Sequence, residues 1–393
     1  MESFDVLIAG GGPAGLAAAH AAASRGRSVL LVEQNKEIGG PIRTSGGSFL
    51  SELRPLNIPD RFSHPIRRLR FLAPTVEAVF PYDQPDLCVL DVRGLYQYLA
   101  EQAIAAGAKL RLATAVTGLL EAGGRVTGAT GRNPLNQSVA WQAATTIDST
   151  GHRSVLLNAR FRRFGVGAEY DLYAPHCDQG DMLLLVGSRV APTGYAWVFP
   201  WGNHRVRIGV GLHHGAPGDS PDHPLPYLDR LITEAANYGV NLRGAQPIEY
   251  HHGLIPAEGV APQLSRPGLL AVGDAGGQAS ALVGEGIRWA IQAGRLAGSL
   301  ATSSQEADYP AQWLATQGRH LALAHDINRR MTTWDDAKWD RRIAMLQGLP
   351  TTHFNTLLKT DFSPAALLHL AWKNPSLWAT GFRELAGRLS LKA

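Results

Sequence analysis

The chain opens with two kinds of hydrophobic pattern in alternation. A short, mostly apolar run, 5–9, ends at a glycine, and a second such run occupies 28–32. Continuous apolar runs of this length are typical of strands buried on both faces of a parallel sheet. Between them lies an alanine-rich segment, 16–24, which favours a helix, and Gly26 is suited to end it. The order strand, helix, strand predicts a βαβ unit.

Further strands are predicted in the middle of the chain. Apolar runs at 181–186, 195–200 and 206–212 indicate three strands of a mixed sheet. Pro200 is expected to end the second of them, because proline lacks the amide that sheet pairing uses. The third run alternates poorly between apolar and polar residues, so we expect it to be buried on both sides.

The last part of the chain, from Tyr309, has apolar residues at helical spacing. Prolines divide this region at Pro350, Pro364 and Pro375. For the apolar stretch 365–372 we expect core packing, with a tunnel wall or a lipid contact as alternatives.

Glycines occupy the predicted turn between the first strand and the first helix. Gly10, Gly12 and Gly15 satisfy the pattern Gly-x-Gly-x-x-Gly. The first permits a tight turn, the second lets a pyrophosphate approach the backbone, and the third lets the helix pack close to the strand. Helix N-terminal amides attract the phosphates, and Glu33, after the second strand, can accept hydrogen bonds from ribose hydroxyls. The alternative is a glycine turn without a ligand. The residues expected to contact the dinucleotide here are Gly10, Gly12, Pro13, Ala14, Gly15, Glu33 and Gln34.

Distant segments favour FAD over NAD as the dinucleotide. A strand at 268–272 ends in Gly273 and Asp274, and an aspartate in that place can bind a ribityl hydroxyl. Gly284 and Gly286 then open another helix, whose amides can face the flavin pyrimidine carbonyls, where charge grows on reduction. The further residues expected to contact FAD are Val116, Asp148, Gly151, Gly273, Asp274, Gly284, Gly286 and Ile287.

These segments resemble the FAD-binding pattern of the flavoprotein hydroxylase superfamily. Within it, 273–277 together with 284–288 resembles the geranylgeranyl reductase family. The segment Pro192-Thr-Gly-Tyr-Ala-Trp-Val-Phe-Pro200 matches that family's substrate-site motif P-x-x-Y-x-W-x-F-P in full. Arg93 is similar to the family's helix-start arginine near FAD. The resemblance covers nearly the whole chain.

The resemblance implies an α/β protein with the p-hydroxybenzoate hydroxylase-like fold. We expect a discontinuous Rossmann-type FAD-binding domain and a mixed-sheet substrate domain. A C-terminal helical region would close over the substrate cavity, as it does in the family. The expected bounds are 1–70, 92–160 and 267–303 for the FAD-binding domain, 71–91 and 161–266 for the substrate domain, and 304–393 for the helical region.

Three aromatic residues of the matching motif are candidate substrate-site residues. Tyr195, Trp197 and Phe199 alternate, so in a strand they point to one face. Ordinary sheet packing would explain them, but the family match favours a wall beside the isoalloxazine for a polyisoprenoid or another flat apolar substrate. Glu285 is a candidate proton donor, and its alternative role is that of a helix-start carboxylate stabilised by the helix dipole.

One loop departs from the family pattern. Family reductases that act on prenyl chains carry a cysteine in the loop after the second strand. Here Arg43 keeps the flavin-side cation, but Thr44 stands in the cysteine's place. The two cysteines, Cys88 and Cys177, are distant in sequence. If the family thiol donates a proton, this chain must use another group.

The residues and the resemblance together predict a FAD-dependent oxidoreductase. We expect NAD(P)H or a small electron carrier, such as an electron-donor protein, to reduce the flavin, which then passes hydride to a C=C bond of an apolar, prenyl-type substrate. No second dinucleotide fingerprint exists, so a nicotinamide would bind transiently at the flavin. The alternatives are a flavin monooxygenase and a flavin or lipid carrier without turnover. Halogenation is disfavoured, because Tyr195 and Phe199 replace the tryptophan and isoleucine of the W-x-W-x-I-P halogenase motif.

The amino-acid composition limits the kinds of binding partner that we expect. The net charge of +4 is dispersed, which disfavours nucleic acid but is compatible with a peripheral membrane contact. Two cysteines and no long apolar run fit a cytoplasmic protein. The pairs His213–His214 and His251–His252 offer at most one ligand per strand face, so no metal site is predicted.

Overall fold

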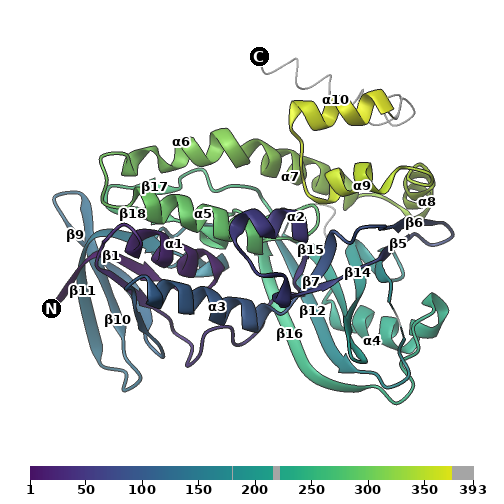
Figure 1. Ribbon diagram of the computed structural model, residues 1–393, viewed down its shortest axis with the longest axis horizontal. Helices are drawn as coiled ribbons and strands as arrows, with labels where there is room; N and C mark the ends of the chain where they lie inside the picture. Colours follow the sequence, from purple (N-terminus) through teal and green to yellow (C-terminus); the bar gives the residue numbers. More distant parts are fainter. Residues whose placement is uncertain (179, 216–221, 374–393) are drawn as a thin grey trace.

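The computed structural model describes residues 1–178, 180–215 and 222–373, with side chains to 368 (Figure 1). Two large sheets lie side by side, an eight-stranded one that contains the N-terminus and a seven-stranded one. Helices of the C-terminal region run along the top of both in the view of Figure 1. The architecture is the α/β fold with mixed sheets that the sequence predicts.

The predicted βαβ unit forms the centre of the eight-stranded sheet. Strand β1 pairs in parallel with β2 on one side and with β11 on the other. Strands β8 and β18 extend this parallel core, and β9, β10 and β17 add antiparallel pairs. The strands are β1 (Glu2–Ala9), β2 (Val29–Val32), β8 (Lys109–Arg111), β9 (Ala115–Ala122), β10 (Arg125–Arg132), β11 (Ser138–Asp148), β17 (Ser265–Arg266) and β18 (Leu269–Ala271).

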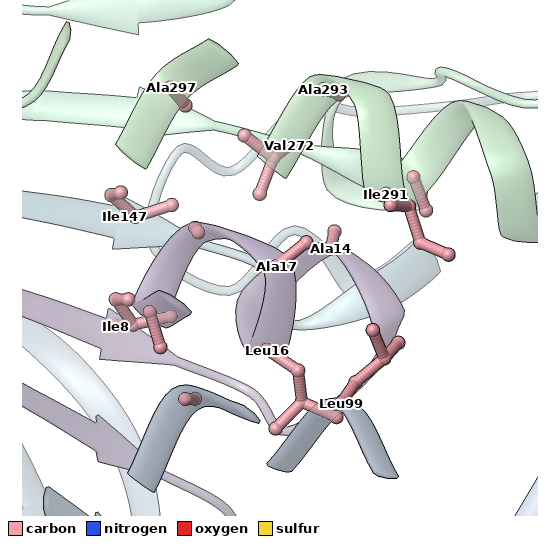
Figure 2. Packing of buried hydrophobic residues seen from close by; sticks show 14 of the residues in the cluster. Ile8, Ala14, Leu16, Ala17, Leu99, Ile147, Val272, Ile291, Ala293 and Ala297 are labelled. Carbon is pink, nitrogen blue, oxygen red and sulfur yellow. The ribbon is translucent and has the colours of Figure 1, made fainter. Parts of the chain in front are cut away.

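Three helices cover this parallel core: α1 (Pro13–Ala23), α3 (Val92–Ala105) and α5 (Ile287–Leu300). Small residues let α1 and α5 pack in very close contact. A Cβ at Gly294 would lie 2.1 Å from the carbonyl oxygen of Ala14, and one at Gly298 would lie 2.3 Å from that of Ala18. Figure 2 shows this alanine-rich contact, with Leu16 on the opposite side of α1 pointing toward Leu99 of α3.

The seven-stranded sheet has the order β16-β12-β15-β14-β13-β5-β6, and only the β13–β5 pair is parallel. The three strands predicted in the middle of the chain are therefore found in one mixed sheet. The third is buried on both sides, as predicted. The strands are β5 (Arg68–Leu72), β6 (Glu77–Pro81), β12 (Phe164–Tyr173), β13 (Met182–Gly187), β14 (Ala191–Gly202), β15 (Arg205–His214) and β16 (Gln246–Pro256).

Pro200 does not end its strand, so that prediction was wrong. The residue lies inside β14, opposite Val206 of β15, and a register irregularity follows between Pro200 and Gly202. The missing amide therefore disturbs the pairing locally, while the hairpin between the two strands continues past it.

Helices cover the two faces of the seven-stranded sheet. Helix α4 (Leu225–Thr233) packs on one face, where Leu228 and Leu231 are buried. Helices α8 and α9 lie over the other face, and Phe354 of α9 stacks on Phe80 of β6 with ring centroids 3.8 Å apart. The C-terminal helices are α6 (Tyr309–Trp313), α7 (Arg319–Met331), α8 (Asp336–Ala344), α9 (Thr351–Leu358) and α10 (Pro364–Lys373).

Two of the three predicted proline boundaries occur in this helical region. Pro350 directly precedes α9 and Pro364 begins α10, whereas Pro375 lies outside the described residues. Leu368 of α10 is 68% exposed, so the core packing expected for 365–372 does not hold at this residue.

A small third sheet joins the two large ones. It pairs β7 (Leu87–Leu90) with β3 (Gly47–Phe49) and β4 (Ser63–Pro65), and helix α2 (Leu50–Leu53) follows β3. The expected domain limit at 70 falls inside β5 of the seven-stranded sheet. The limit at 266 falls inside the eight-stranded sheet, at the end of β17. The domain bounds therefore stay a prediction, and the sheets place these two limits slightly earlier in the chain.

Candidate functional site

The glycine loop forms an open cradle at the N-terminus of α1. Gly10 has a φ of +109°, a conformation that glycine tolerates and other residues rarely adopt. Gly12 is the N-cap residue of α1, and a Cβ built on it would meet nothing within 4 Å. The free amides of the first helical turn therefore face open space, as an anion site requires.

Glu33 lies at the end of β2, beside this cradle. It is only 7% exposed, and its carboxylate accepts the Gly11 amide at 2.6 Å and the Asn35 amide at 2.7 Å. These two contacts hold the carboxylate at the edge of the cleft.

Asp274 lies across the same cleft, in the turn that follows β18. No hydrogen bond or ion pair within the described part of the chain satisfies its carboxylate, and burial raises its pKa to about 6. A half-buried carboxylate without a protein partner is costly unless a ligand supplies donors. A cradle for phosphates at one end and a carboxylate that lacks donors at the other fit a dinucleotide such as FAD.

The cleft between these groups has a volume of about 290 Å³. It contains most of the residues that the sequence predicts for the cofactor. Those lining it are Gly10, Gly12, Pro13, Ala14, Glu33, Gln34, Arg43, Thr44, Val116, Gly151, Gly273, Asp274, Gly284, Gly286 and Ile287.

Three predicted cofactor residues do not line the cleft. Gly15 has a packing role, since a Cβ there would lie 2.1 Å from the Gly10 carbonyl oxygen. Asp148 is fully buried, and its carboxylate accepts the amides of Thr150, Leu156 and Leu157 in the turn after β11. The third residue, Arg93, forms ion pairs instead, at 3.1 Å with Glu37 and at 3.3 Å with Glu249.

A larger, apolar cavity of about 330 Å³ lies between the seven-stranded sheet and helices α7, α8 and α9. Leu69, Leu184 and Met182 line it from the sheet, and Trp339 and Phe354 line it from the helices. Tyr195, Phe199 and Glu285 lie on its wall as well. The cavity is enclosed by hydrocarbon on most sides, which suits a long apolar ligand.

The aromatic residues of the motif do face one side of β14, as their alternation predicts. The ring centroids of Tyr195 and Trp197 are 5.6 Å apart, and those of Trp197 and Phe199 are 6.1 Å apart. The Tyr195 hydroxyl donates a hydrogen bond to the carbonyl oxygen of Val283 at 2.6 Å. The indole N–H of Trp197 donates to Glu169 at 2.6 Å, away from the apolar cavity.

Trp197 belongs to a row of residues that cross four neighbouring strands. It lies opposite Gly209 of β15, which lies opposite Glu169 of β12, which lies opposite His251 of β16. A Cβ at Gly209 would lie 2.4 Å from the indole ring, so the absence of a side chain there lets the tryptophan lie flat and reach Glu169.

The adjacent row of the same face is made of glycines. Tyr195 lies opposite Gly211, followed by Gly167 and Gly253 on the next two strands. Together with Trp197, Glu169 and His251 of the first row, these glycines line a small cavity of about 100 Å³. This small cavity shares Thr44 with the cofactor cleft and Tyr195 with the apolar cavity, so it lies between the two sites.

Glu285 lines the apolar cavity and is 6% exposed. Ser48 donates a hydrogen bond to one of its oxygens at 3.0 Å, and Arg288 contacts the other at 2.7 Å. Burial raises the pKa of Glu285, while the guanidinium of Arg288 opposes the shift.

Sequence reasoning missed Glu169 and treated His251 only as a metal ligand. The signal was the spacing of Glu249, His251 and Gly253, which puts all three on one strand face. Glu169 carries no motif of its own and is identified only once the strands are aligned. In the described part of the chain, no group of three or more His, Cys, Asp or Glu residues could hold a metal ion.

Neither cysteine replaces the thiol that the resemblance led us to expect at the position of Thr44. Cys88 and Cys177 are both buried, and neither lines the cleft or the two cavities. Burial raises the pKa of the Cys88 thiol to about 12. Thr44 itself lines both the cofactor cleft and the small cavity.

Comparisons with known proteins assign the chain to a family. Residues 5–179 match the family described as FAD dependent oxidoreductase, and residues 165–254 match the geranylgeranyl reductase catalytic domain. A digeranylgeranylglycerophospholipid reductase of Methanothermobacter thermautotrophicus is 31% identical over an alignment of 365 positions, which covers 88% of this chain and 92% of that protein. The chain is a member of the geranylgeranyl reductase family of FAD-dependent oxidoreductases.

Solved structures agree with the family fold. A geranylgeranyl bacteriochlorophyll reductase-like protein from Thermoplasma acidophilum aligns with a TM-score of 0.83 and 24% identity, over 96% of this chain and 98% of that one. The myxobacterial chondrochloren halogenase aligns with a TM-score of 0.67 and 17% identity, over 93% and 92% of the two chains. This geranylgeranyl reductase family member thus has the p-hydroxybenzoate hydroxylase-like fold. None of its described helices is long and apolar enough to cross a membrane.

Proposed function

We propose that this protein saturates C=C bonds in the prenyl chains of a lipid. The observation that carries the proposal is the apolar cavity, which meets the cofactor side of the molecule at Tyr195. The names of the relatives, which are reductases of digeranylgeranylglycerophospholipids, support the same substrate class.

The cavity is suited to a hydrocarbon chain because burial of each CH₂ group contributes about 0.8 kcal/mol. Its wall offers few polar groups for a headgroup, which would stay outside. A substrate of this kind resides in a membrane, so we propose that the protein works at a membrane surface. Leu368 on α10, which is 68% exposed, is one apolar contact available for that purpose.

In the proposed reaction, FAD when bound would supply the redox chemistry, which is hydride transfer to the substrate with electrons from NAD(P)H or a small electron carrier. The chain's residues bind and orient the reactants. The amides at Gly12 would hold the diphosphate, and the Asp274 carboxylate would accept a hydrogen bond from a ribityl hydroxyl. Arg43 and Thr44, which line the cleft, would lie beside the flavin, and the Tyr195–Trp197 wall would keep water from the reacting carbons.

A C=C bond needs one proton in addition to the hydride, so an acid of the chain must complete the reaction. Glu285, proposed from the sequence, lines the apolar cavity, and Phe199 shapes the cavity beside it. Glu169 is a second buried carboxylate near Tyr195, on the side of the small cavity.

The test is turnover of the purified FAD-containing protein with a panel of prenyl lipids, with and without oxygen, read by mass spectrometry. A gain of two hydrogens per reduced bond, independent of oxygen, is the expected result. Incorporation of oxygen would replace the proposal with monooxygenation, a reaction that the shared fold with flavin monooxygenases keeps as the second candidate. Binding of FAD without turnover of any prenyl lipid would indicate a flavin or lipid carrier instead of an enzyme.

A further inference from the structure

A buried hydrogen-bonded chain leads from the small cavity toward the surface. Glu169, which is 2% exposed, accepts the indole N–H of Trp197 with one oxygen and contacts Nδ1 of His251 at 2.8 Å with the other. The second ring nitrogen of His251, Nε2, lies 2.9 Å from Glu249. The Glu249 side chain is 37% exposed, so this hydrogen-bonded path ends in contact with solvent.

The strand register explains why these groups meet. Glu169 and His251 are direct cross-strand neighbours on β12 and β16, and Glu249 lies two residues before His251 on the same face. The glycine at 209 removes the side chain that would separate Trp197 from Glu169. Four strands of one sheet therefore build a single polar path under the aromatic wall.

Glu285 differs from Glu169 in that its partners cannot return a proton to it from solvent. Its charged partner is Arg288, which also pairs with Glu52 at 3.0 Å. A guanidinium keeps its protons at any physiological pH, so Arg288 stabilises a carboxylate but cannot resupply a proton. The other partner, Ser48, is 1% exposed and does not connect Glu285 with solvent.

His251 can hold and release a proton at physiological pH. Burial alone lowers its pKa, but the hydrogen bonds to Glu169 and Glu249 outweigh this effect and raise it above the ordinary value. Arg207 of β15, two strands away, acts in the opposite direction, and Arg93 of α3 pairs with Glu249. A histidine between two carboxylates thus connects the buried acid to solvent.

We propose that Glu169 and His251 together are the proton donor that completes reduction of the C=C bond, and that Glu249 is the positioning residue through which the pair regains its proton from solvent. This inference rests on the proposed function. If the cysteine that the family carries at the position of Thr44 donates a proton, Glu169 performs that task here.

The step is balanced for each bond reduced. The hydride forms a C–H bond at one alkene carbon, and the π electrons form the second C–H bond with a proton of the Glu169–His251 pair. The carboxylate of Glu169 takes this proton from Nδ1 of His251 and delivers it to the carbon, so the N–H bond breaks and the pair is left as a carboxylate and a neutral imidazole. One proton from solvent restores the pair before the next bond is reduced. A prenyl chain with several double bonds requires one such proton transfer for each bond.

The experiment measures how fast a prenyl lipid reoxidises the reduced FAD of the holoprotein, anaerobically and as a function of pH. Three variants are compared with the wild type: Glu169→Gln, His251→Gln and, as the matched rival, Glu285→Gln. The flavin absorption spectrum and the rate of flavin reduction by dithionite are recorded for each variant, because a misplaced cofactor would change both. Glu169→Asp serves as the conservative variant.

We expect Glu169→Gln and His251→Gln to slow the reoxidation at least about a hundredfold, the ordinary contribution of a positioned acid. We also expect both to lose the pH dependence of the wild type, with unchanged flavin spectra and reduction rates. A double variant that combines Glu169→Gln with His251→Gln should be no slower than the slower single variant, because the two residues act as one unit. Glu169→Asp should recover part of the rate and the pH profile.

The inference is overturned if Glu169→Gln keeps the wild-type rate and pH profile, or if Glu285→Gln alone removes the pH dependence. A wild-type protein that is not reoxidised by any prenyl lipid would reject the proposed function, and the inference with it. The mass of the wild-type product separates these two failures.

Discussion

The hydroxyl of Tyr195 donates a hydrogen bond to the carbonyl oxygen of Val283 at 2.6 Å. The contact joins β14 of the seven-stranded sheet to the loop that precedes α5, the helix that packs on the eight-stranded sheet. Tyr195 lines both cavities, so this one bond holds the aromatic wall at the point where the substrate side meets the cofactor side.

Loss of this bond should affect catalysis more than folding. Tyr195→Phe leaves the Val283 carbonyl without its donor, at a cost of about 1–2 kcal/mol in the free energy of unfolding. We expect retained FAD, and a kcat for prenyl reduction lowered by about tenfold, because a misplacement of the wall slows hydride transfer. Steady-state kinetics and urea unfolding measure the two effects. An unchanged kcat would show that the hydroxyl does not position the wall.

Gly12→Val should abolish cofactor retention without unfolding the protein. The backbone at Gly12 is extended, with φ of −77° and ψ of 179°, which valine adopts readily, and the added side chain meets only open space. That space is where we propose the diphosphate binds, so FAD content should fall at least about tenfold. Gly180→Val is the matched control, because a Cβ there also meets nothing within 4 Å. Copurification of FAD with Gly12→Val would contradict the proposed binding mode.

Asp274→Asn should stabilise the apoprotein and weaken FAD binding. Folding raises the pKa of Asp274 from 3.8 to about 6, so the ionised form destabilises the native state at neutral pH by up to about 3 kcal/mol. The asparagine variant removes this penalty but loses the carboxylate that we assign to the ribityl chain. Thermal unfolding of the apoprotein and titration with FAD test both halves. A lower melting temperature together with tighter FAD binding would refute the assignment.

The stability of the apoprotein should fall as the pH rises through the pKa of His251. Because folding raises this pKa above its ordinary value, the protonated ring contributes stability that is fully present below about pH 6.5. That contribution is lost as the pH passes the raised value. The difference in melting temperature between wild type and His251→Gln, followed from about pH 6 to about pH 9, should therefore shrink. A difference in melting temperature that grows with pH would contradict the predicted direction of the His251 pKa shift.

Leu346→Trp should change chain-length preference and leave the cofactor alone. Leu346 lines the apolar cavity but not the cofactor cleft, so a larger ring there shortens the space for a prenyl chain. We expect KM to rise about tenfold for long prenyl lipids and little for short ones, with FAD content unchanged. Equal effects on the KM of long and short prenyl lipids would show that the prenyl chain does not reach this part of the cavity.

The sequence was sufficient where the determining pattern is local. The apolar runs around Gly10, Gly12 and Gly15 predicted the βαβ unit, because strand, turn and helix are adjacent in the chain. The alternation of Tyr195, Trp197 and Phe199 likewise predicted their common face. Local pattern also misled, since Asp148 ends a strand as a ligand-binding carboxylate would, yet its hydrogen bonds are used by its own turn.

The path through Glu169 and His251 was beyond such reasoning. It depends on the register of four strands, and a shift of one residue in any of them would move its side chain to the other face. Long-range register of this kind is decided by packing on both faces of the sheet, which no short segment contains. The same is true of Arg93, whose partners Glu37 and Glu249 are distant in sequence.

The walls of the cofactor cleft have a consequence for biosynthesis. Its floor is complete only when β18 has paired with β11 and α5 has packed against α1, although its glycine loop stands at the very start of the chain. If flavin binds in this cleft as we propose, a nascent polypeptide can capture it only after Ile287 has emerged from the ribosome and α5 has packed against α1. We therefore expect cofactor acquisition to follow most of translation.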